Sequence, residues 1–251
     1  MFEPRVAVAS LSGESDADWA RAAAPNVGAA FLGGIALDEG AREAASRMVT
    51  DRDRSEFLPP DPFAFIDDQL ARLEDVPVRP GFNVRSATPE PVGTAARVCA
   101  DHDAILEVNA HWRQDELCEI GCGESLLADT DRLVEYVELA ARSGATVSVK
   151  VRAEVPGVDL ARTARAVSAA GARFLHVDAM DSEPVVETVV DAAPDLVVIA
   201  NNGVRDRETA HEYLRYGADA VSVGRPSDNP TVLERVRRAT DAWFHEREAT
   251  A

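Results

Sequence analysis

The feature that most constrains the fold is a repeated unit in the second half of the chain, in which a glycine closes a helix and an apolar strand follows at once. Three copies are centred on Gly144, Gly171 and Gly217, each followed by alanine. Glycine is favoured just after a helix, where the backbone turns left-handed. The copies lie 27 and 46 residues apart, and the wider gap holds one more apolar run, 196–200. The repeat therefore predicts three consecutive βα units.

The same alternation of apolar runs and helical segments extends back to the N-terminus. The expected strands cover residues 5–9, 27–32, 81–86, 104–109, 146–151, 173–178, 196–200 and 220–223. Helices are expected from about Asp16, from Asp38, over 62–73, after Pro89 and over 230–246. Strands that are apolar throughout are typical of a parallel sheet covered on both faces. The pattern predicts one α/β domain over residues 1–251, a (β/α)8 TIM barrel. An open Rossmann-type sheet is the alternative, but no Gly-x-Gly-x-x-Gly motif follows the first strand.

Two local features refine this prediction. Gly33 and Gly34 follow the second apolar run and are expected to end that strand. The segment 51–63 carries three prolines among charged residues, which predicts a long loop. Long loops in compact domains tend to be functional or mobile, so this segment is a candidate to lie near a binding site.

The charge balance of the chain restricts its partners. The sequence has 44 acidic and 26 basic residues, a formal net charge of −18, and acidic residues spread along its length. Such a surface suits concentrated salt, which screens the self-repulsion. A docking face for a cationic partner is the alternative, and the dispersal argues against it. Nucleic-acid binding needs clustered lysine and arginine, so an RNA substrate would require a local basic patch.

The sequence shows no sign of export or membrane insertion. No apolar run approaches the roughly 20 residues that span a bilayer, and the N-terminus enters a strand-like run without a signal peptide. We therefore expect a soluble, cytoplasmic protein with no membrane partner. The cysteines, Cys99, Cys118 and Cys122, match neither a disulfide scaffold nor a zinc site, so we expect free thiols and no metal.

Composition singles out one residue. Lys150 is the only lysine, beside 25 arginines. A lysine kept against such a bias indicates a task that needs a compact ammonium in a confined site rather than a planar guanidinium. Lys150 lies at the carboxyl end of the expected strand 146–151, where parallel α/β folds bind ligands. The alternative is a lysine whose stem covers apolar surface without a further role.

The carboxyl ends of the expected strands are polar throughout. In a barrel they share one mouth, which would collect Ser10, Asn83, Arg85, Asn109, His111, Lys150, Arg152, His176 or Asp178, Asn201, Asn202, Gly203, Gly224 and Arg225. Gly203 and Gly224 follow the last two strands, where barrels commonly hold a phosphate. Glycine lets backbone N–H groups approach an oxyanion, and Arg225 can add a charge-assisted contact. A purely steric reason for the two glycines is the alternative.

Five runs of sequence carry a family resemblance, namely 107–109, 121–127, 149–152, 200–203 and 221–225. In this order they resemble the tRNA-dihydrouridine synthase family, most closely its short archaeal, barrel-only relatives, over roughly residues 80–230. The resemblance implies a barrel that binds FMN, as in the wider flavin group that includes dihydroorotate dehydrogenases. Lys150 would meet the pyrimidine edge of the flavin and stabilise the anionic reduced ring. Asn83, Asn109 and Asp178 would lie against ring or substrate, and the phosphate cradle would comprise Asn202, Gly203, Gly224 and Arg225.

The sequence also departs from the family pattern. The family's catalytic cysteine lies in an Asn-x-Gly-Cys-Pro run, and the matching run, 109–113, has Trp112 in its place. Tryptophan cannot act as the proton donor that such a reductase needs. His111 is the preferred replacement because its pKa suits proton transfer near neutrality, although a histidine merely hydrogen-bonded in the loop is the alternative. Cys118 is a second candidate if exposed, whereas Cys122, between two glycines, is expected to be a packed small residue.

Two further departures concern the cofactor and the substrate. Asp178 stands where the family usually has a histidine, and the sequence ends at Ala251 without the C-terminal helical domain that grips tRNA. The resemblance thus implies an FMN-dependent oxidoreductase acting on a pyrimidine, either free, as a nucleotide, or in tRNA. Two other classes stay open: a flavin- or phosphate-binding barrel with a binding or regulatory role, and an isomerase or aldolase in which Lys150 forms a Schiff base.

Overall fold

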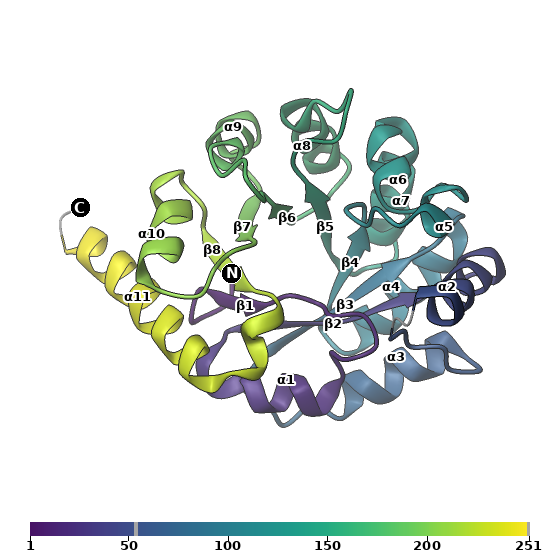
Figure 1. The fold of residues 1–251 in the computed structure, drawn as a ribbon, viewed down its shortest axis with the longest axis horizontal. Helices are drawn as coiled ribbons and strands as arrows, with labels where there is room; N and C mark the ends of the chain where they lie inside the picture. The colour runs from purple at the N-terminus through teal and green to yellow at the C-terminus, as the bar shows by residue number, and fades with distance from the viewer. Residues whose placement is uncertain (53–54, 250–251) are drawn as a thin grey trace.

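Eight parallel strands form a closed barrel in the computed structural model of the protein, with helices around it (Figure 1). The structure describes residues 1–52 and 55–249. The strands are β1 (Val6–Val8), β2 (Ala29–Ala36), β3 (Arg79–Arg85), β4 (Ile105–Asn109), β5 (Thr146–Arg152), β6 (Phe174–Asp178), β7 (Val197–Asn201) and β8 (Ala220–Val223). They are paired in sequence order, and β1 closes the barrel against β8. The predicted (β/α)8 TIM barrel is confirmed.

The helices surround the barrel in the order of the chain. They are α1 (Ala17–Ala23), α2 (Glu39–Arg52), α3 (Pro62–Ala71), α4 (Pro89–Asp101), α5 (Asp115–Cys118), α6 (Glu124–Ala128), α7 (Thr130–Arg142), α8 (Leu160–Ala169), α9 (Val185–Ala192), α10 (Arg207–Arg215) and α11 (Pro230–Glu248), with two 3₁₀ turns, η1 (Ala24–Asn26) and η2 (Arg225–Asp228). Asp16 caps α1 through the Trp19 N–H. The three repeat glycines have φ of +93° at Gly144, +104° at Gly171 and +89° at Gly217, so their predicted left-handed positions are confirmed.

Two local predictions were wrong. Gly33 and Gly34 do not end the second strand, because β2 continues to Ala36 and only its register against β3 shifts there. The expected loop 51–63 is shorter, because α2 extends to Arg52 and α3 starts at Pro62; residues 53 and 54 lie outside the described part of the chain. The helix expected over 62–73 is confirmed at its start, because proline is tolerated in the first turn of a helix and Pro62 begins α3.

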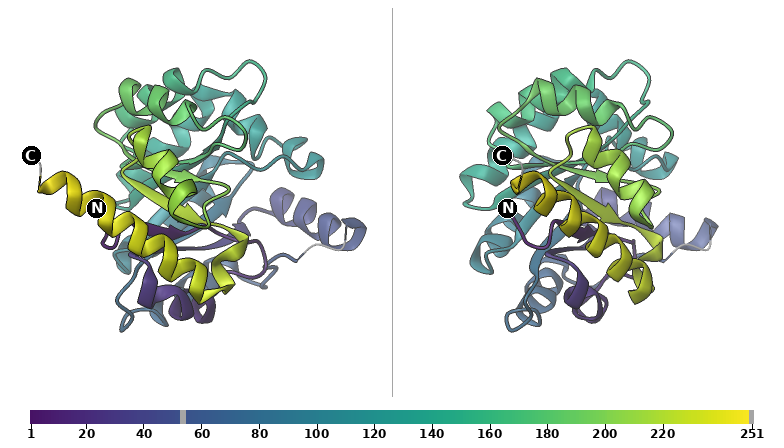
Figure 2. Two further views of the ribbon diagram at one scale, coloured as in Figure 1. Left: turned by 60° about the vertical axis from the view of Figure 1, so that its left-hand side comes forward. Right: turned by 90° about the vertical axis from the view of Figure 1, so that its left-hand side faces the viewer.

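Helix α2 is an insertion at the mouth of the barrel. It follows β2 but projects beyond the carboxyl ends of the strands, on the side opposite to the C-terminal end of α11 (Figure 2). The segment after it returns to the barrel, where Phe57 forms a bridge with Ile35. Leu117 of α5 and Cys122 are buried with alanines of α2 in a small core of their own. The helix that packs beside the barrel in this unit is therefore α3, which contacts α4.

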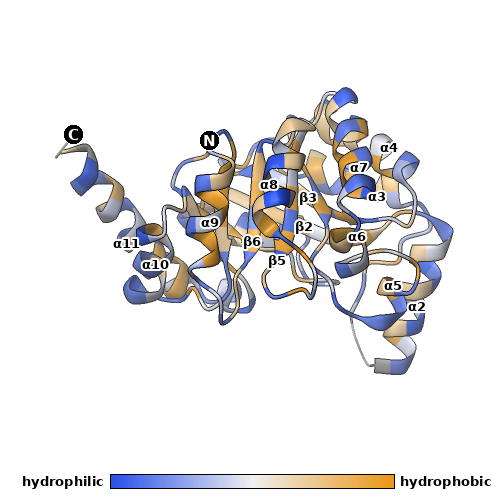
Figure 3. Ribbon diagram, turned by 90° about the horizontal axis from the view of Figure 1, so that it is seen from above, coloured by the Kyte–Doolittle hydropathy of each residue, from blue (hydrophilic) through white to orange (hydrophobic). Residues whose placement is uncertain are grey.

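The apolar core has two parts. The main core lies between the sheet and the helices, and Figure 3 shows apolar residues along β5, β6 and α9 with hydrophilic residues on the outer helical faces. A second cluster fills the barrel near the amino ends of the strands, namely Phe2, Ala7, Ala29, Phe31, Ile105, Phe174, Val197, Ile199 and Ala220. The interior thus becomes polar only toward the carboxyl ends. No helix within residues 1–52 and 55–249 is long and apolar enough to cross a membrane.

Candidate active site at the carboxyl ends of the strands

A cavity of about 430 Å³ opens at the mouth of the barrel. Its lining comes from the ends of β1 and of β4 to β8, and consists of Ala9, Ser10, Leu11, His111, Lys150, Asp178, Met180, Asn201, Asn202, Gly203, Val204, Arg205, Gly224, Arg225 and Pro226. This volume is within the range of small-molecule and cofactor sites. Most of the predicted site residues therefore meet in one place. The predicted ones that do not line the cavity are Asn83, Arg85, Asn109, Cys118, Arg152, which pairs with Glu124, and His176, the alternative to Asp178.

The turns after β7 and β8 offer free backbone donors to this cavity. Within the described chain, the N–H groups of Gly203, Val204, Gly224 and Arg225 donate no hydrogen bond to another protein group. A Cβ built on Gly203 or Gly224 would meet no atom within 4 Å. Steric contact with the protein therefore does not require glycine at either position. At Gly203 the left-handed φ of +67° is a second reason for glycine. Free N–H groups beside open space are what an oxyanion requires.

Other residues fix the shape of this cradle. Asn202, with a φ of +94°, donates from Nδ2 to Asp178 Oδ1 over 2.8 Å. The Tyr213 hydroxyl, reaching from α10, donates to the carbonyl oxygens of Asn201 and Asn202. Asp178 therefore holds the turn after β7 through its hydrogen bond with Asn202. Arg225 is exposed at the rim, where its side chain can reach a bound anion.

Lys150 enters the cavity from β5. The residue is only 2 % exposed and lines the cavity. Within residues 1–52 and 55–249, its ammonium group forms no hydrogen bond or ion pair with another side chain. Burial lowers the pKa of Lys150, while the charges of Glu107 and Asp178 raise it in part. A buried ammonium that is not engaged by the protein can bind an anionic or carbonyl group of a ligand.

A hydrogen-bonded network fills the barrel beneath the cavity, and Glu107 is at its centre. Glu107 Oε1 accepts from Asn83 Nδ2 at 2.8 Å, and its Oε2 accepts from Ser148 Oγ at 3.0 Å and contacts His176 Nδ1 at 2.8 Å. His176 Nε2 lies 2.7 Å from Ser222 Oγ. These five side chains are fully buried. The ring of Phe31, in the apolar layer below, lies 5.1 Å from that of His176.

His111 lies on the cavity wall and is oriented by Asn109. Asn109 Oδ1 accepts from the backbone N–H groups of His111 and Trp112, both at 3.3 Å, which identifies it as the amide oxygen. His111 Nδ1, 3.0 Å from the same oxygen, must therefore carry a proton and donate it. Burial, together with the positive charge of Lys150, lowers the pKa of His111 well below its ordinary value. At neutral pH, His111 Nε2 is therefore an acceptor.

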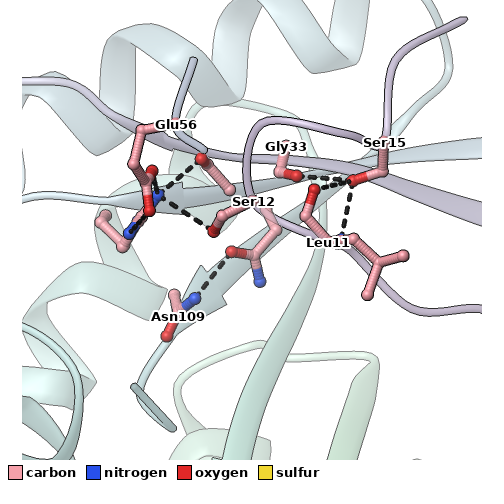
Figure 4. Close-up of polar contacts among 9 residues, drawn as sticks. Leu11, Ser12, Ser15, Gly33, Glu56 and Asn109 are labelled. Carbon is pink, nitrogen blue, oxygen red and sulfur yellow. Dashed lines mark hydrogen bonds and ion pairs between the residues drawn. The ribbon is translucent and has the colours of Figure 1, made fainter. Parts of the chain in front are cut away.

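A buried ion pair forms the other side of the mouth. The guanidinium of Arg85 pairs with both carboxylate oxygens of Glu56 and donates to the Gly34 carbonyl at 2.6 Å. Glu56 and Ser12 approach this point together, above Asn109 (Figure 4). The guanidinium carbon also lies 5.0 Å from the Trp112 ring centre. Arg85 therefore joins β3 to the segment that returns from α2, away from the cavity lining.

Ser15 holds the loop between β1 and α1 in place. Its Oγ bonds the carbonyl oxygens of Leu11 and Gly33 at 2.8 Å and 2.6 Å (Figure 4).

The cysteines do not line the cavity. Cys118 is half-buried and points its thiol at the Trp112 carbonyl, and burial raises the pKa of this thiol. Cys122 is buried, which raises its pKa to about 12 and confirms it as a packed residue.

Sequence reasoning missed the network around Glu107. Glu107, Ser148 and Ser222 were given no role, and His176 was only an alternative to Asp178. A signal was present, because polar residues alternate with apolar ones in β4, β6 and β8, the strands that contain Glu107, His176 and Ser222. Side chains of a strand alternate between its faces, so residues two apart both point into a closed barrel.

The fold and the site together define a (β/α)8 barrel with a ligand cavity at the carboxyl ends of its strands, equipped with an anion cradle and a buried lysine. The sequence model of the dihydrouridine synthase family matches residues 80–250. The chain belongs to the dihydrouridine synthase family, a family of flavin-dependent oxidoreductases whose members typically bind FMN.

Individual relatives show that the similarity covers most of the chain and that the barrel fold is shared. An uncharacterized protein of Methanocaldococcus jannaschii, MJ0144, is 27 % identical over 238 residues, which is 89 % of each chain. Two structures of tryptophan synthase from Pyrococcus furiosus superpose with TM-scores of 0.58 and 0.57 at 13 % and 12 % identity, and cover 96 % of this chain and 98 % of theirs. At this identity the likeness concerns the barrel fold alone.

Proposed function

We propose that the protein is an FMN-dependent oxidoreductase that transfers a hydride to or from the carbon–carbon double bond of a pyrimidine. The observation that carries the proposal is the union, in one cavity of about 430 Å³, of the glycine cradle after β7 and β8 with the single lysine on β5. Membership of the dihydrouridine synthase family supports the same chemistry. Neither feature alone would distinguish this barrel from many others.

The donors of the cavity fit FMN. The backbone N–H groups at Gly203 and Gly224 would hold its phosphate, with Arg225 adding a charge at the rim. FMN, when bound, would supply the centre that exchanges the hydride with the substrate. The Lys150 ammonium, desolvated and free of protein partners within the described chain, would stabilise negative charge on the ring.

His111 is the group that would exchange a proton with the substrate. Its Nε2 is an acceptor at neutral pH, which suits removal of a proton from a saturated pyrimidine. Delivery of a proton to an unsaturated pyrimidine would require His111 to be protonated first. Cys118 and Cys122 do not line the cavity, which favours His111 over either thiol.

The surface charge favours a small substrate over tRNA. The net charge of −18 opposes phosphate backbones at ordinary ionic strength. The loops after β5 and β6 add the exposed carboxylates of Glu154 and Asp181 near the mouth. We therefore propose a free pyrimidine base or nucleotide as the substrate.

The proposal is tested by the absorption spectrum of the protein purified in concentrated salt, followed by identification of whatever is released on denaturation. We expect stoichiometric FMN. Lys150→Ala should lower flavin occupancy or the rate of flavin reduction, whereas Lys150→Arg keeps the charge but not the compact ammonium and should restore either only in part. Gly224→Ala, which places a methyl group in open cavity space, should weaken FMN binding without loss of stability.

The outcomes separate the open alternatives. A protein that stays colourless after FMN is added would refute the oxidoreductase proposal. Trapping of a carbonyl compound on Lys150 by borohydride would then support Schiff-base chemistry. Bound FMN without turnover of any pyrimidine would instead favour a binding role.

A further inference from the structure

We propose that Glu107 is the counter-charge that keeps the Lys150 ammonium protonated inside the barrel, and that His176 and Ser222 are positioning residues that hold the Glu107 carboxylate in place. The inference concerns the site of the proposed function and rests on it only for the identity of the ligand that Lys150 meets. The counter-charge itself is a property of the chain alone. Glu107 is 0 % exposed and Lys150 is 2 % exposed, so neither charge is stabilised by bulk water.

The hydrogen bonds around Glu107 favour an ionised carboxylate. Asn83 presents its amide nitrogen to Glu107, because its own Oδ1 accepts from Asn109 Nδ2 at 2.8 Å. The amide orientation of Asn109 is itself fixed by the two backbone N–H groups that its oxygen accepts. Ser148 has a hydroxyl to donate to the same carboxylate. An ionised carboxylate accepts from the Asn83 amide on one oxygen and from the Ser148 hydroxyl on the other, and such hydrogen bonds favour the charged form.

His176 and Ser222 complete this arrangement. If His176 Nδ1 donates to Glu107 Oε2, its Nε2 is left to accept the Ser222 hydroxyl proton, and every group in the chain is satisfied. His176 is then neutral, which agrees with a pKa lowered by burial. Although burial by itself raises the pKa of Glu107, its neighbours His176, Lys150 and Asn83 bring it below the ordinary value. The network thus contains one full negative charge, on Glu107.

Charged and titratable groups approach Lys150 from both neighbouring strands. Glu107 and His111 come from β4 and the turn after it, and His176 and Asp178 come from β6. Of the two carboxylates, Asp178 is partly exposed and already bonded to Asn202, whereas Glu107 is fully buried. A buried charge is screened least, so Glu107 dominates the proton affinity of Lys150. Glu107 has no oxygen to spare for a ligand, but the Lys150 ammonium does have free protons.

The single lysine makes this proposal directly measurable. Protein labelled with lysine that carries ¹⁵N at Nζ gives one side-chain nitrogen signal, that of Lys150. Its chemical shift is followed against pH in the ligand-free full chain. We expect Glu107→Gln to move the titration midpoint of Lys150 to lower pH by about one unit or more, the size expected for loss of an adjacent opposite charge. Asp178→Asn should cause a smaller shift in the same direction.

Two matched variants test the positioning roles. Ser222→Ala leaves His176 Nε2 without its donor, so we expect a shift smaller than that of Glu107→Gln and in the same direction. Ser148→Ala removes one direct bond to the carboxylate but no charge, so here too we expect a shift in the same direction that is smaller than that of Glu107→Gln. Far-ultraviolet circular dichroism reports whether each variant is folded. If Glu107→Gln does not fold, a Lys150 midpoint that is the same in Ser222→Ala, Asp178→Asn and wild type overturns the proposal.

The failure of this proposal and that of the proposed function are distinguishable. A Lys150 midpoint that Glu107→Gln leaves unchanged, or that Asp178→Asn lowers more than Glu107→Gln does, refutes the role of Glu107 even in a protein that binds FMN. A protein that never binds FMN but shows the expected shifts retains the counter-charge and loses only the flavin assignment.

Discussion

The ion pair between Arg85 and Glu56 gives the sharpest prediction about stability. Its two side chains are 0 % and 1 % exposed. Removing one partner leaves the other charge buried without compensation, which typically costs about 3–5 kcal/mol. Glu56→Gln keeps the shape of the side chain and removes the charge. Arg85 would then keep neutral acceptors alone: the amide oxygen of the new side chain, the Gly34 carbonyl and a long contact of 3.4 Å to Ser12 Oγ.

The expected magnitude follows from these contacts. We expect Glu56→Gln to lower the free energy of unfolding by about 3 kcal/mol and Arg85→Met by about 3–5 kcal/mol. Such losses are a large share of the roughly 5–15 kcal/mol that stabilise a typical protein. The double variant Glu56→Leu/Arg85→Met should be less destabilised than Arg85→Met alone, because it buries no unpaired charge. The segment between α2 and α3 should then be held by apolar contacts.

Urea unfolding at one fixed salt concentration measures these differences, because urea does not change the ionic strength. The control is Glu138→Gln in α7, whose exposed partner is Arg142 and whose pair is worth about 0.5 kcal/mol or less. Two results would refute the reasoning: Glu56→Gln costing no more than this control, or the double variant losing as much stability as Arg85→Met alone, or more.

Two further predictions concern titration and thiol chemistry. Burial holds the His111 pKa below the ordinary value of 6.5, so at this pH the unfolded chain binds more protons than the folded one. The contribution of neutral His111 to stability is therefore complete above pH 6.5 and is lost as the pH falls. The free energy of unfolding of wild type should fall more between pH 6.5 and 5.5 than that of His111→Gln, by up to about 1.4 kcal/mol, and equal slopes would contradict a lowered pKa. Cys99 and Cys122 are buried with pKa values raised to about 12, so a thiol reagent at neutral pH should modify only Cys118 in the native protein and all three cysteines after unfolding. Rapid native modification of two or more thiols would contradict this burial.

The repeat at Gly144, Gly171 and Gly217 was enough to predict three βα units, because a left-handed helix end followed by an apolar run is a local property. The eight alternating apolar runs then predicted the barrel. The strand boundaries were also close, since burial on both faces makes each strand an uninterrupted apolar run. The wrong prediction that Gly33 and Gly34 end the second strand has a non-local cause. Glycine usually marks a turn, but here the neighbouring strand β3 pairs with both sides of the glycine pair and keeps it in the sheet.

The candidate site also has features that follow from the sequence and features that depend on the tertiary structure. The sequence by itself determined that Lys150, the glycine turns and the polar strand ends share one mouth, because parallel strands in a closed barrel end on the same side. Only the tertiary structure decided that Asn83 and Asn109 lie beneath the cavity, that Cys118 lies away from it, and that Glu107 is held by Asn83 and His176, with Ser222 behind His176. The longest of those contacts, between Glu107 and His176, joins residues that are 69 positions apart. Their physical origin is the closure of the barrel, which brings inward-facing residues of distant strands within hydrogen-bond distance and excludes the water that would otherwise satisfy them.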